Sequence, residues 1–217
     1  MTILVTGSTG KTSSRLTDLL VKSGYEVLIA SRSGKAGQPQ PGVAFDWKDP
    51  STHNNPFTSP QAQKSPITAI YIVAPDATNV IEPMTKFLDF AKDKGVKRFV
   101  LLSASMIDAD GPLLGPVHKH ILTMGVEWAV LRPTWFMENL IQEGAGYKLD
   151  QIKNENVIRT ATGNGKLPFV SVDDIAAVAF RALVDEKAHN TDHIILGPEL
   201  LTYGDVGIPA HPSLAVY

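Results

Sequence analysis

The chain has 217 residues, of which 43% are hydrophobic and 19% are charged, and it carries a formal net charge of −2 and no cysteine. These values fit one globular α/β domain and exclude a strongly basic nucleic-acid-binding protein; the lack of cysteine excludes disulfides, thiol catalysis and thiolate-bound metal. We expect a cytoplasmic protein without a metal site and without nucleic-acid or membrane partners. The first strand leaves no room for a signal peptide, and no apolar run is long enough to cross a bilayer.

Short apolar runs alternate with helical patterns along the chain. The apolar runs predict strands at residues 3–5, 25–30, 43–47, 67–73, 98–102 and 128–131, with shorter ones at 157–161 and 193–196. The patterns between them predict helices at residues 12–20, 80–94, 115–124 and 172–185. Two stretches show no clear period, so we expect an irregular surface loop at residues 50–66 and an irregular tail at 206–217.

Strands that are apolar throughout and alternate with helices are typical of a parallel sheet covered on both faces. Right-handed crossovers then produce the doubly wound α/β sheet of Rossmann-like proteins. The chain contains no internal repeat and no interdomain linker. The sequence therefore predicts one Rossmann-like domain over residues 1–205, followed by the tail.

The glycine turn near the N-terminus is the clearest binding motif. Residues 6–10 (Thr-Gly-Ser-Thr-Gly) join the first strand to a helix, so backbone N–H groups and the positive end of a helix dipole meet at one point. That point suits the pyrophosphate of a dinucleotide. Ser13 stands where a third glycine often allows close packing, and serine is small enough for that position. A P-loop is the alternative, but its first glycine would be Val5, and the loop is too short to wrap a β-phosphate.

The end of the second strand indicates which dinucleotide is bound. A site for NAD usually places an acidic residue there, which accepts a hydrogen bond from the ribose 2′-hydroxyl. Here the strand ends in Ala-Ser-Arg-Ser at residues 30–33, and Glu26 lies at the opposite end. Arg32 can pair with a 2′-phosphate through two hydrogen bonds, although a lone arginine can also be an ordinary surface residue. The position of Arg32 and the missing acid favour NADP.

A proton donor of the usual kind is missing. Short-chain reductases commonly carry Tyr-x-x-x-Lys after the fifth strand, where the tyrosine protonates the reduced carbonyl oxygen. None of the five tyrosines has a lysine four positions later. Ser103 and His118 are weak candidates for substrate contact and proton relay, and the alternatives are a strand-end cap and an exposed helix residue. The chain is therefore either non-catalytic or reduces a group such as an iminium ion, which accepts hydride without a proton.

Several segments together resemble a known family. They are MTILVTGSTGKTSSR at the N-terminus, RFVLLSAS at 98–105, VLRPTWFMENL at 130–140, TATGNGKLPFVSVDDIAAVAF at 160–180 and HIILGPELL at 193–201. They are similar to the NmrA-like atypical short-chain reductases and, within these, to the fungal ergot-alkaloid agroclavine and festuclavine dehydrogenases. The resemblance implies NADPH-dependent reduction of the clavine iminium that forms when chanoclavine-I aldehyde cyclises. It also implies an indole alkaloid as substrate and an upstream pathway enzyme that supplies the aldehyde.

The resemblance also implies a set of site residues. By family position, the pyrophosphate would contact Gly7, Ser8, Thr9, Gly10, Lys11 and Thr12, and the 2′-phosphate would contact Arg32. The adenine would lie against Asp46, and the nicotinamide ribose would lie near Ala74 and Pro75. The substrate would contact Trp135, Phe136 and Met137. An aromatic wall suits a flat indole-fused cation, and the alternative for its two rings is ordinary core packing. Members of this family continue past residue 201 with helices that close the pocket. The resemblance therefore implies that residues 1–205 form an NAD(P)-binding domain with a reduced substrate region, followed by a short tail. A non-catalytic NADP-binding sensor and an inactive truncated enzyme therefore stay open as alternatives.

Overall fold

The computed structural model describes residues 1–7, 10–35, 40–75, 79–140, 152, 154–155, 157–210 and 215–216. Across these residues the chain forms a seven-stranded sheet in the order β3-β2-β1-β4-β5-β6-β8, and every neighbouring pair is parallel. The order reverses between β1 and β4, so the predicted doubly wound, Rossmann-like class is confirmed. The strands are β1 (Thr2–Thr6), β2 (Glu26–Ser31), β3 (Gly42–Ala44), β4 (Ile67–Val73), β5 (Arg98–Leu102), β6 (Glu127–Pro133) and β8 (Thr191–Ile195).

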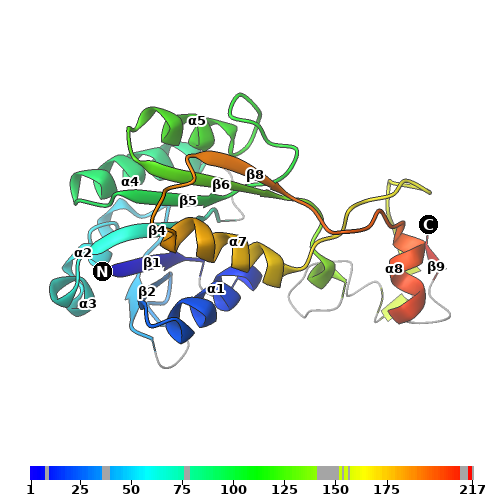
Figure 1. Cartoon of the computed structure of the whole chain (residues 1–217), viewed down its shortest axis with the longest axis horizontal. Coiled ribbons are helices and arrows are strands. Elements are labelled where there is room, and N and C mark those ends of the chain that lie inside the picture. Colours follow the sequence, from blue (N-terminus) through cyan, green and yellow to red (C-terminus); the bar gives the residue numbers. More distant parts are fainter. Residues whose placement is uncertain are drawn as a thin grey trace.

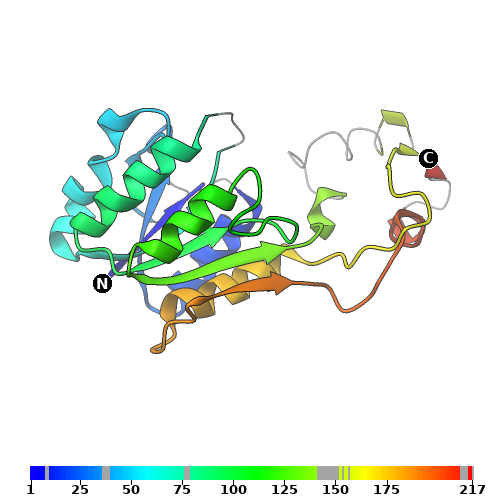
Figure 2. The same ribbon diagram turned by 90° about the horizontal axis from the view of Figure 1, so that it is seen from above.

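Helices cover both faces of the sheet (Figures 1 and 2). They are α1 (Lys11–Lys22) and α7 (Val172–Val184) on one face, and α4 (Ile81–Asp93) and α5 (Gly115–Thr123) on the other. Side chains of each strand alternate between two cores, as in β1, where Leu4 packs with α4 while Ile3 and Val5 pack with α1 and α7. Burial on both faces explains why the strands are apolar throughout.

The segment 50–66 is largely helical, so the prediction of an irregular loop was wrong. It forms the short helices η1 (Pro50–Thr52), α2 (Asn55–Thr58) and α3 (Pro60–Lys64). Each has a proline in its first turn, where the missing N–H breaks no helical hydrogen bond. The side chains of Asp49 and Ser59 accept hydrogen bonds from backbone N–H groups and cap two of these helices. The helices are too short to show a helical period in the sequence.

A smaller group of elements projects beyond the carboxyl ends of β6 and β8 (Figure 1). Its described elements are η2 (Met137–Asn139), β7 (Val157–Ile158), α8 (Tyr203–Ala210) and β9 (Ala215–Val216). β7 and β9 pair in parallel, and a small core buries Leu140, Ile158, Phe169 and Tyr203. We call this set the C-terminal group. No helix among the described residues is both long and apolar enough to cross a membrane.

Helix α8 extends into residues 206–217, and strand β9 lies within them, so the expectation of an irregular tail was wrong at these elements. A reciprocal cap starts α8: the Thr202 hydroxyl accepts from the Asp205 N–H at 3.1 Å, and the Asp205 carboxylate accepts from the Thr202 N–H at 2.8 Å. Such a cap stabilises a helix whose sequence shows little apolar periodicity.

Candidate functional site

The predicted glycine turn joins β1 to α1 and requires glycine at two positions. Gly7 has a φ of 65°, and a Cβ atom there would lie 2.9 Å from the Cβ of Val73. A Cβ atom on Gly10 would lie 2.9 Å from the Gly7 carbonyl oxygen, which accepts a 2.7 Å hydrogen bond from the Gly10 N–H. Close contacts within the protein therefore require glycine at both positions. Ser8 and Thr9 fall outside the described residues.

The start of α1 offers a site for an anion. Gly10 is the N-cap residue and has no side chain to cap the helix, and no acidic residue lies in the first turn. The first N–H groups of α1 and the positive end of its dipole are thus available to a phosphate. Ser13 is fully buried and donates to the Thr6 carbonyl oxygen at 3.0 Å, so it holds α1 close to β1 where a third glycine often stands. These features fit the pyrophosphate of a dinucleotide.

Thr12 and Tyr71 turn inwards beneath the glycine turn. The Tyr71 hydroxyl donates to Thr12 Oγ1 at 3.1 Å, and both side chains are buried. Burial raises the pKa of Tyr71, so its phenol stays protonated at neutral pH. Tyr71 thus supports α1, while Thr12 keeps its own hydroxyl proton for an acceptor in the site.

Arg32 and Asp46 follow neighbouring strands at the carboxyl edge of the sheet. β2 and β3 pair Ser31 with Ala44, so Arg32 and Asp46 come one and two residues after a paired position. Arg32 is exposed and has no hydrogen-bond or ion-pair partner among the described residues. Asp46 is partly buried and accepts a 2.9 Å hydrogen bond from the Lys48 N–H. Both residues therefore lie at the edge of the sheet that carries the glycine turn.

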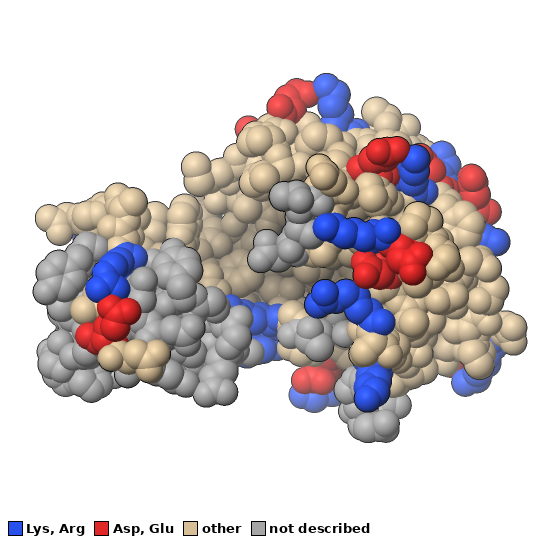
Figure 3. Space-filling model, turned by 180° about the vertical axis from the view of Figure 1, so that it is seen from behind, with Lys and Arg blue, Asp and Glu red and all other residues tan. Residues whose placement is uncertain are grey.

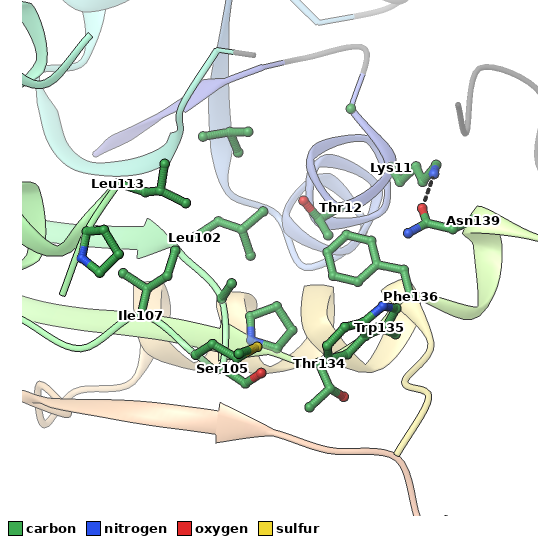
Figure 4. A pocket seen from close by; sticks show the side chains of 16 residues that line it. Lys11, Thr12, Leu102, Ser105, Ile107, Leu113, Thr134, Trp135, Phe136 and Asn139 are labelled. Atoms are coloured by element: carbon green, nitrogen blue, oxygen red, sulfur yellow. Dashed lines mark hydrogen bonds between the residues drawn. The ribbon is translucent and has the colours of Figure 1, made fainter. Parts of the chain in front are cut away.

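A pocket of about 730 Å³ opens between the start of α1 and the segments that follow β5 and β6. Figure 3 shows this side of the molecule hollowed, with uncharged residues over most of the visible wall. Trp135 and Phe136 form one side of the pocket, and Ile107 and Leu113 lie across the opening from them (Figure 4). The other described lining residues are Gly10, Lys11, Thr12, Val73, Leu102, Ala104, Ser105, Met106, Pro112, Pro133, Thr134 and Asn139.

Lys11 is the one ionisable side chain in the described lining. Its ammonium group donates to Asn139 Oδ1 at 2.5 Å across one end of the pocket (Figure 4). Burial lowers the pKa of Lys11, and the nearby Glu138 carboxylate opposes this effect. Within the part of the chain that the structure describes, the lining therefore offers no carboxyl, imidazole or phenol group as a proton donor.

Two consecutive residues of η2 anchor the aromatic wall to two helix ends. Asn139 accepts from Lys11 at the start of α1. Glu138 is 9% exposed, and its carboxylate accepts from the Ser171 hydroxyl at 3.1 Å and from the Val172 N–H at 3.0 Å at the start of α7. Negative charge is stabilised at a helix N-terminus, so this position suits a buried glutamate. The aromatic wall is thereby fixed beside the glycine turn.

Several predicted residues lie outside this pocket. The Ala74–Pro75 pair is not in the lining, where Val73 takes its place, and Met137 packs against the core of the C-terminal group. The Ser103 hydroxyl is buried without a partner among the described residues, whereas Ser105, two positions later, lines the pocket. Sequence reasoning also missed the wall that the residues after β5, from Ala104 onwards, contribute to the pocket. The signal that could have found it is their place just after the carboxyl end of a strand, where ligands of such sheets bind.

The structure does not bring His118, considered above as a proton relay, to the pocket. His118 lies on α5, is 4% exposed, and is not in the described lining. Burial lowers its pKa, and the charges of Asp192, Arg132 and Asp108 act on it as well. His118 therefore lies close to the charged side chains of these three residues.

Acidification is expected to destabilise the protein through His118. Folding lowers its pKa below the unfolded value of about 6.5, so the unfolded chain takes up a proton first as the pH falls. The stability that neutral His118 contributes is complete above about pH 6.5 and is lost as the pH falls through the lowered, folded-state pKa. The loss amounts to about 1.4 kcal/mol for each unit by which folding lowers the pKa.

Denaturant unfolding at about pH 7.5 and about pH 5.5 checks this expectation. The drop in the free energy of unfolding should be smaller for His118→Gln than for the wild type. An equal drop in both proteins would contradict the role assigned to His118.

The parallel sheet, the glycine turn and the pocket at the carboxyl edge define a Rossmann-like protein, a class that binds dinucleotides at that edge. The chain belongs to the NmrA-like family, whose model matches residues 1–207. It is 44% identical to agroclavine dehydrogenase of Claviceps fusiformis over 207 residues and 47% identical to festuclavine synthase II of Penicillium roqueforti over 210 residues. Each match covers 95% of this chain and 71% of the relative. The predicted resemblance is confirmed.

The fold is also similar to that of a solved reductase. The crystal structure of Citrobacter sp. triphenylmethane reductase complexed with NADP(H) superposes with a TM-score of 0.73 at 18% sequence identity. The match covers 94% of this chain and 72% of that one.

Proposed function

We propose that the chain is an NADPH-dependent reductase of the clavine iminium ion that forms when chanoclavine-I aldehyde cyclises, with agroclavine or festuclavine as product. The observation that carries this proposal is a pocket beside the glycine turn whose described wall is aromatic and apolar and has Lys11 as its one ionisable group. An iminium carbon that accepts hydride becomes a neutral amine, so the wall needs to orient the substrate but not to protonate it. The names of the two relatives support this substrate class.

The chain's own residues would hold and orient both ligands. The nicotinamide supplies the hydride when the dinucleotide is bound. Gly7, Gly10 and the start of α1 would hold the pyrophosphate, and Lys11 would neutralise part of its charge. Trp135 and Phe136 would present their π faces to the flat cation. Phosphate charge near Lys11 would offset the repulsion between Lys11 and a cationic substrate.

Arg32 supports NADP as the preferred dinucleotide. Its exposed guanidinium has no partner within the described residues and follows β2, where an NAD site would carry an acid. A guanidinium can hold a phosphate through two charge-assisted hydrogen bonds. The solved Citrobacter reductase of similar fold is complexed with NADP(H), which agrees with this assignment.

A non-catalytic NADP-binding protein, such as a sensor, is the second candidate. The observation in its favour is that the described lining has no acid that could complete a carbonyl reduction. A protein of this kind would bind NADPH and leave it unchanged, and so would an inactive enzyme.

Turnover by the purified chain separates these candidates. Freshly cyclised chanoclavine-I aldehyde is added with NADPH, and NADPH absorbance and product mass are followed together. The proposal expects one clavine amine for each NADPH consumed. NADPH binding without turnover would favour the sensor or an inactive enzyme over the proposal, and the absence of both would contradict all three.

Trp135→Ala is expected to raise KM for the iminium by about tenfold, because it removes a stacking surface and a cation–π contact. NADPH affinity should stay unchanged. Trp135 is 36% exposed, so the fold should tolerate the change. Steady-state kinetics measure the effect, and Leu196→Ala is the control because Leu196 is 55% exposed and outside the lining. An unchanged KM in Trp135→Ala would remove the aromatic wall from the proposal.

A further inference from the structure

One wall of the pocket comes from the segment between β5 and α5, which we call the 103–114 loop. The loop contributes the lining residues Ala104, Ser105, Met106, Ile107, Pro112 and Leu113. Met106 is 78% exposed and Leu113 is 72% exposed, so packing holds these two side chains only weakly, whereas Ile107 is buried. Contacts of the loop with the rest of the protein therefore help to set the position of the wall.

A single buried side chain supplies such contacts. Arg132 on β6 is 8% exposed, and its guanidinium forms ion pairs with Asp108 of the loop and with Asp192 of β8. The same guanidinium donates to the Ser105 carbonyl oxygen at 2.9 Å. Arg132 thus holds the loop at two points and is itself fixed to the edge strand.

The opposite wall follows Arg132 directly in the chain. Pro133, Thr134, Trp135 and Phe136 all line the pocket, and Figure 4 shows Ile107 and Leu113 across the opening from the two aromatic residues. A backbone hydrogen bond also connects the two walls, because the Ser105 N–H donates to the Pro133 carbonyl oxygen at 2.9 Å. One guanidinium therefore connects the start of one wall with the loop that forms the other.

We propose that Arg132 is a positioning residue that sets the width of the pocket by holding Ser105 and Asp108 at a fixed distance from the aromatic wall. Arg132 does not line the pocket, so it acts on the substrate only through the loop. A planar guanidinium suits this role, because it reaches two carboxylates and a carbonyl from one rigid group. The effect on substrate rests on the proposed function.

Asp108→Asn tests the proposal with little risk to folding, because the Asp108 side chain is 74% exposed. The change weakens one attachment of the loop and leaves Arg132 paired with Asp192. We expect KM for the iminium to rise by about threefold to tenfold, kcat to change by less than about twofold, and NADPH affinity to be unchanged. Amide hydrogen exchange at residues 104–109 should become faster.

Asp110→Asn is the matched control. Asp110 is in the same loop, its side chain is 82% exposed, and it pairs with Lys119 at 2.6 Å and not with Arg132. It should keep the wild-type KM and the wild-type exchange at residues 104–109. Equal effects of the two variants, or no effect of Asp108→Asn on KM and exchange, would overturn the proposal. The exchange measurement needs no turnover, so it decides the role of Arg132 even if the iminium is not a substrate.

Discussion

Gly7→Ala is expected to weaken NADPH binding by at least about tenfold. Gly7 has a φ of 65°, where a side chain costs about 1–2 kcal/mol, and its new Cβ would lie 2.9 Å from the Cβ of Val73. The turn must open to relieve this contact, which moves the N–H groups at the start of α1 away from a pyrophosphate. Fluorescence titration with NADPH measures the loss, and thermal unfolding measures the accompanying change in stability.

Gly95→Ala is the control that separates the effect of backbone strain on stability from the loss of NADPH binding. Gly95 has a φ of 95°, but a Cβ atom there meets nothing within 4 Å, and the residue lies between α4 and β5. It should lower the stability by about 1 kcal/mol and leave the NADPH affinity unchanged. The assignment of the glycine turn fails if Gly7→Ala binds NADPH as tightly as Gly95→Ala does.

Arg32→Asp is expected to shift the ratio of NADPH to NADH affinity by about a hundredfold or more towards NADH. If Arg32 holds the 2′-phosphate as proposed, the change removes a bidentate charge-assisted contact, adds repulsion against the phosphate, and supplies an acceptor for the 2′-hydroxyl of NADH. Arg32 is exposed and has no partner among the described residues, so the melting temperature should barely change. Titrations with both dinucleotides give the ratio.

Lys35→Asp controls for the change in total charge. Lys35 is exposed and lies three positions after Arg32, and the substitution changes the charge by the same amount. It should move the ratio only slightly at physiological salt, because charges beyond direct contact are screened. If both variants shift the ratio equally, Arg32 does not hold the 2′-phosphate.

Most of the fold could be predicted because parallel strands buried on both faces leave unbroken apolar runs. Residues 67–73 and 98–102 show this directly, since β4 and β5 have those same bounds. The helices of residues 50–66 could not be predicted, because each is shorter than two helical turns and is stabilised by proline and capping side chains. Helix α8 depends in the same way on the Thr202–Asp205 cap.

The candidate site also contains parts that the sequence predicts and parts that it does not. The glycine turn and Arg32 are local patterns and could be predicted as candidates from a few neighbouring residues. The pocket wall depends on tertiary structure: Ser105, Leu113 and Asn139 line one pocket because β5 and β6 end side by side. No sequence period reports which of Ser103 and Ser105 faces the opening, and the bond between Lys11 and Asn139 joins residues 128 positions apart.

The anchoring of η2 bears on how substrate preference can be altered. Glu138 and Asn139 fasten this segment to the first turns of α7 and α1, and neither contact involves the rings of Trp135 or Phe136. The ring positions can therefore be redesigned in size and shape while the polar dipeptide keeps the backbone in place. An insertion between Phe136 and Asn139 would instead move the aromatic wall away from the glycine turn. Libraries aimed at a different substrate preference should vary the two aromatic positions and leave the length of this segment unchanged.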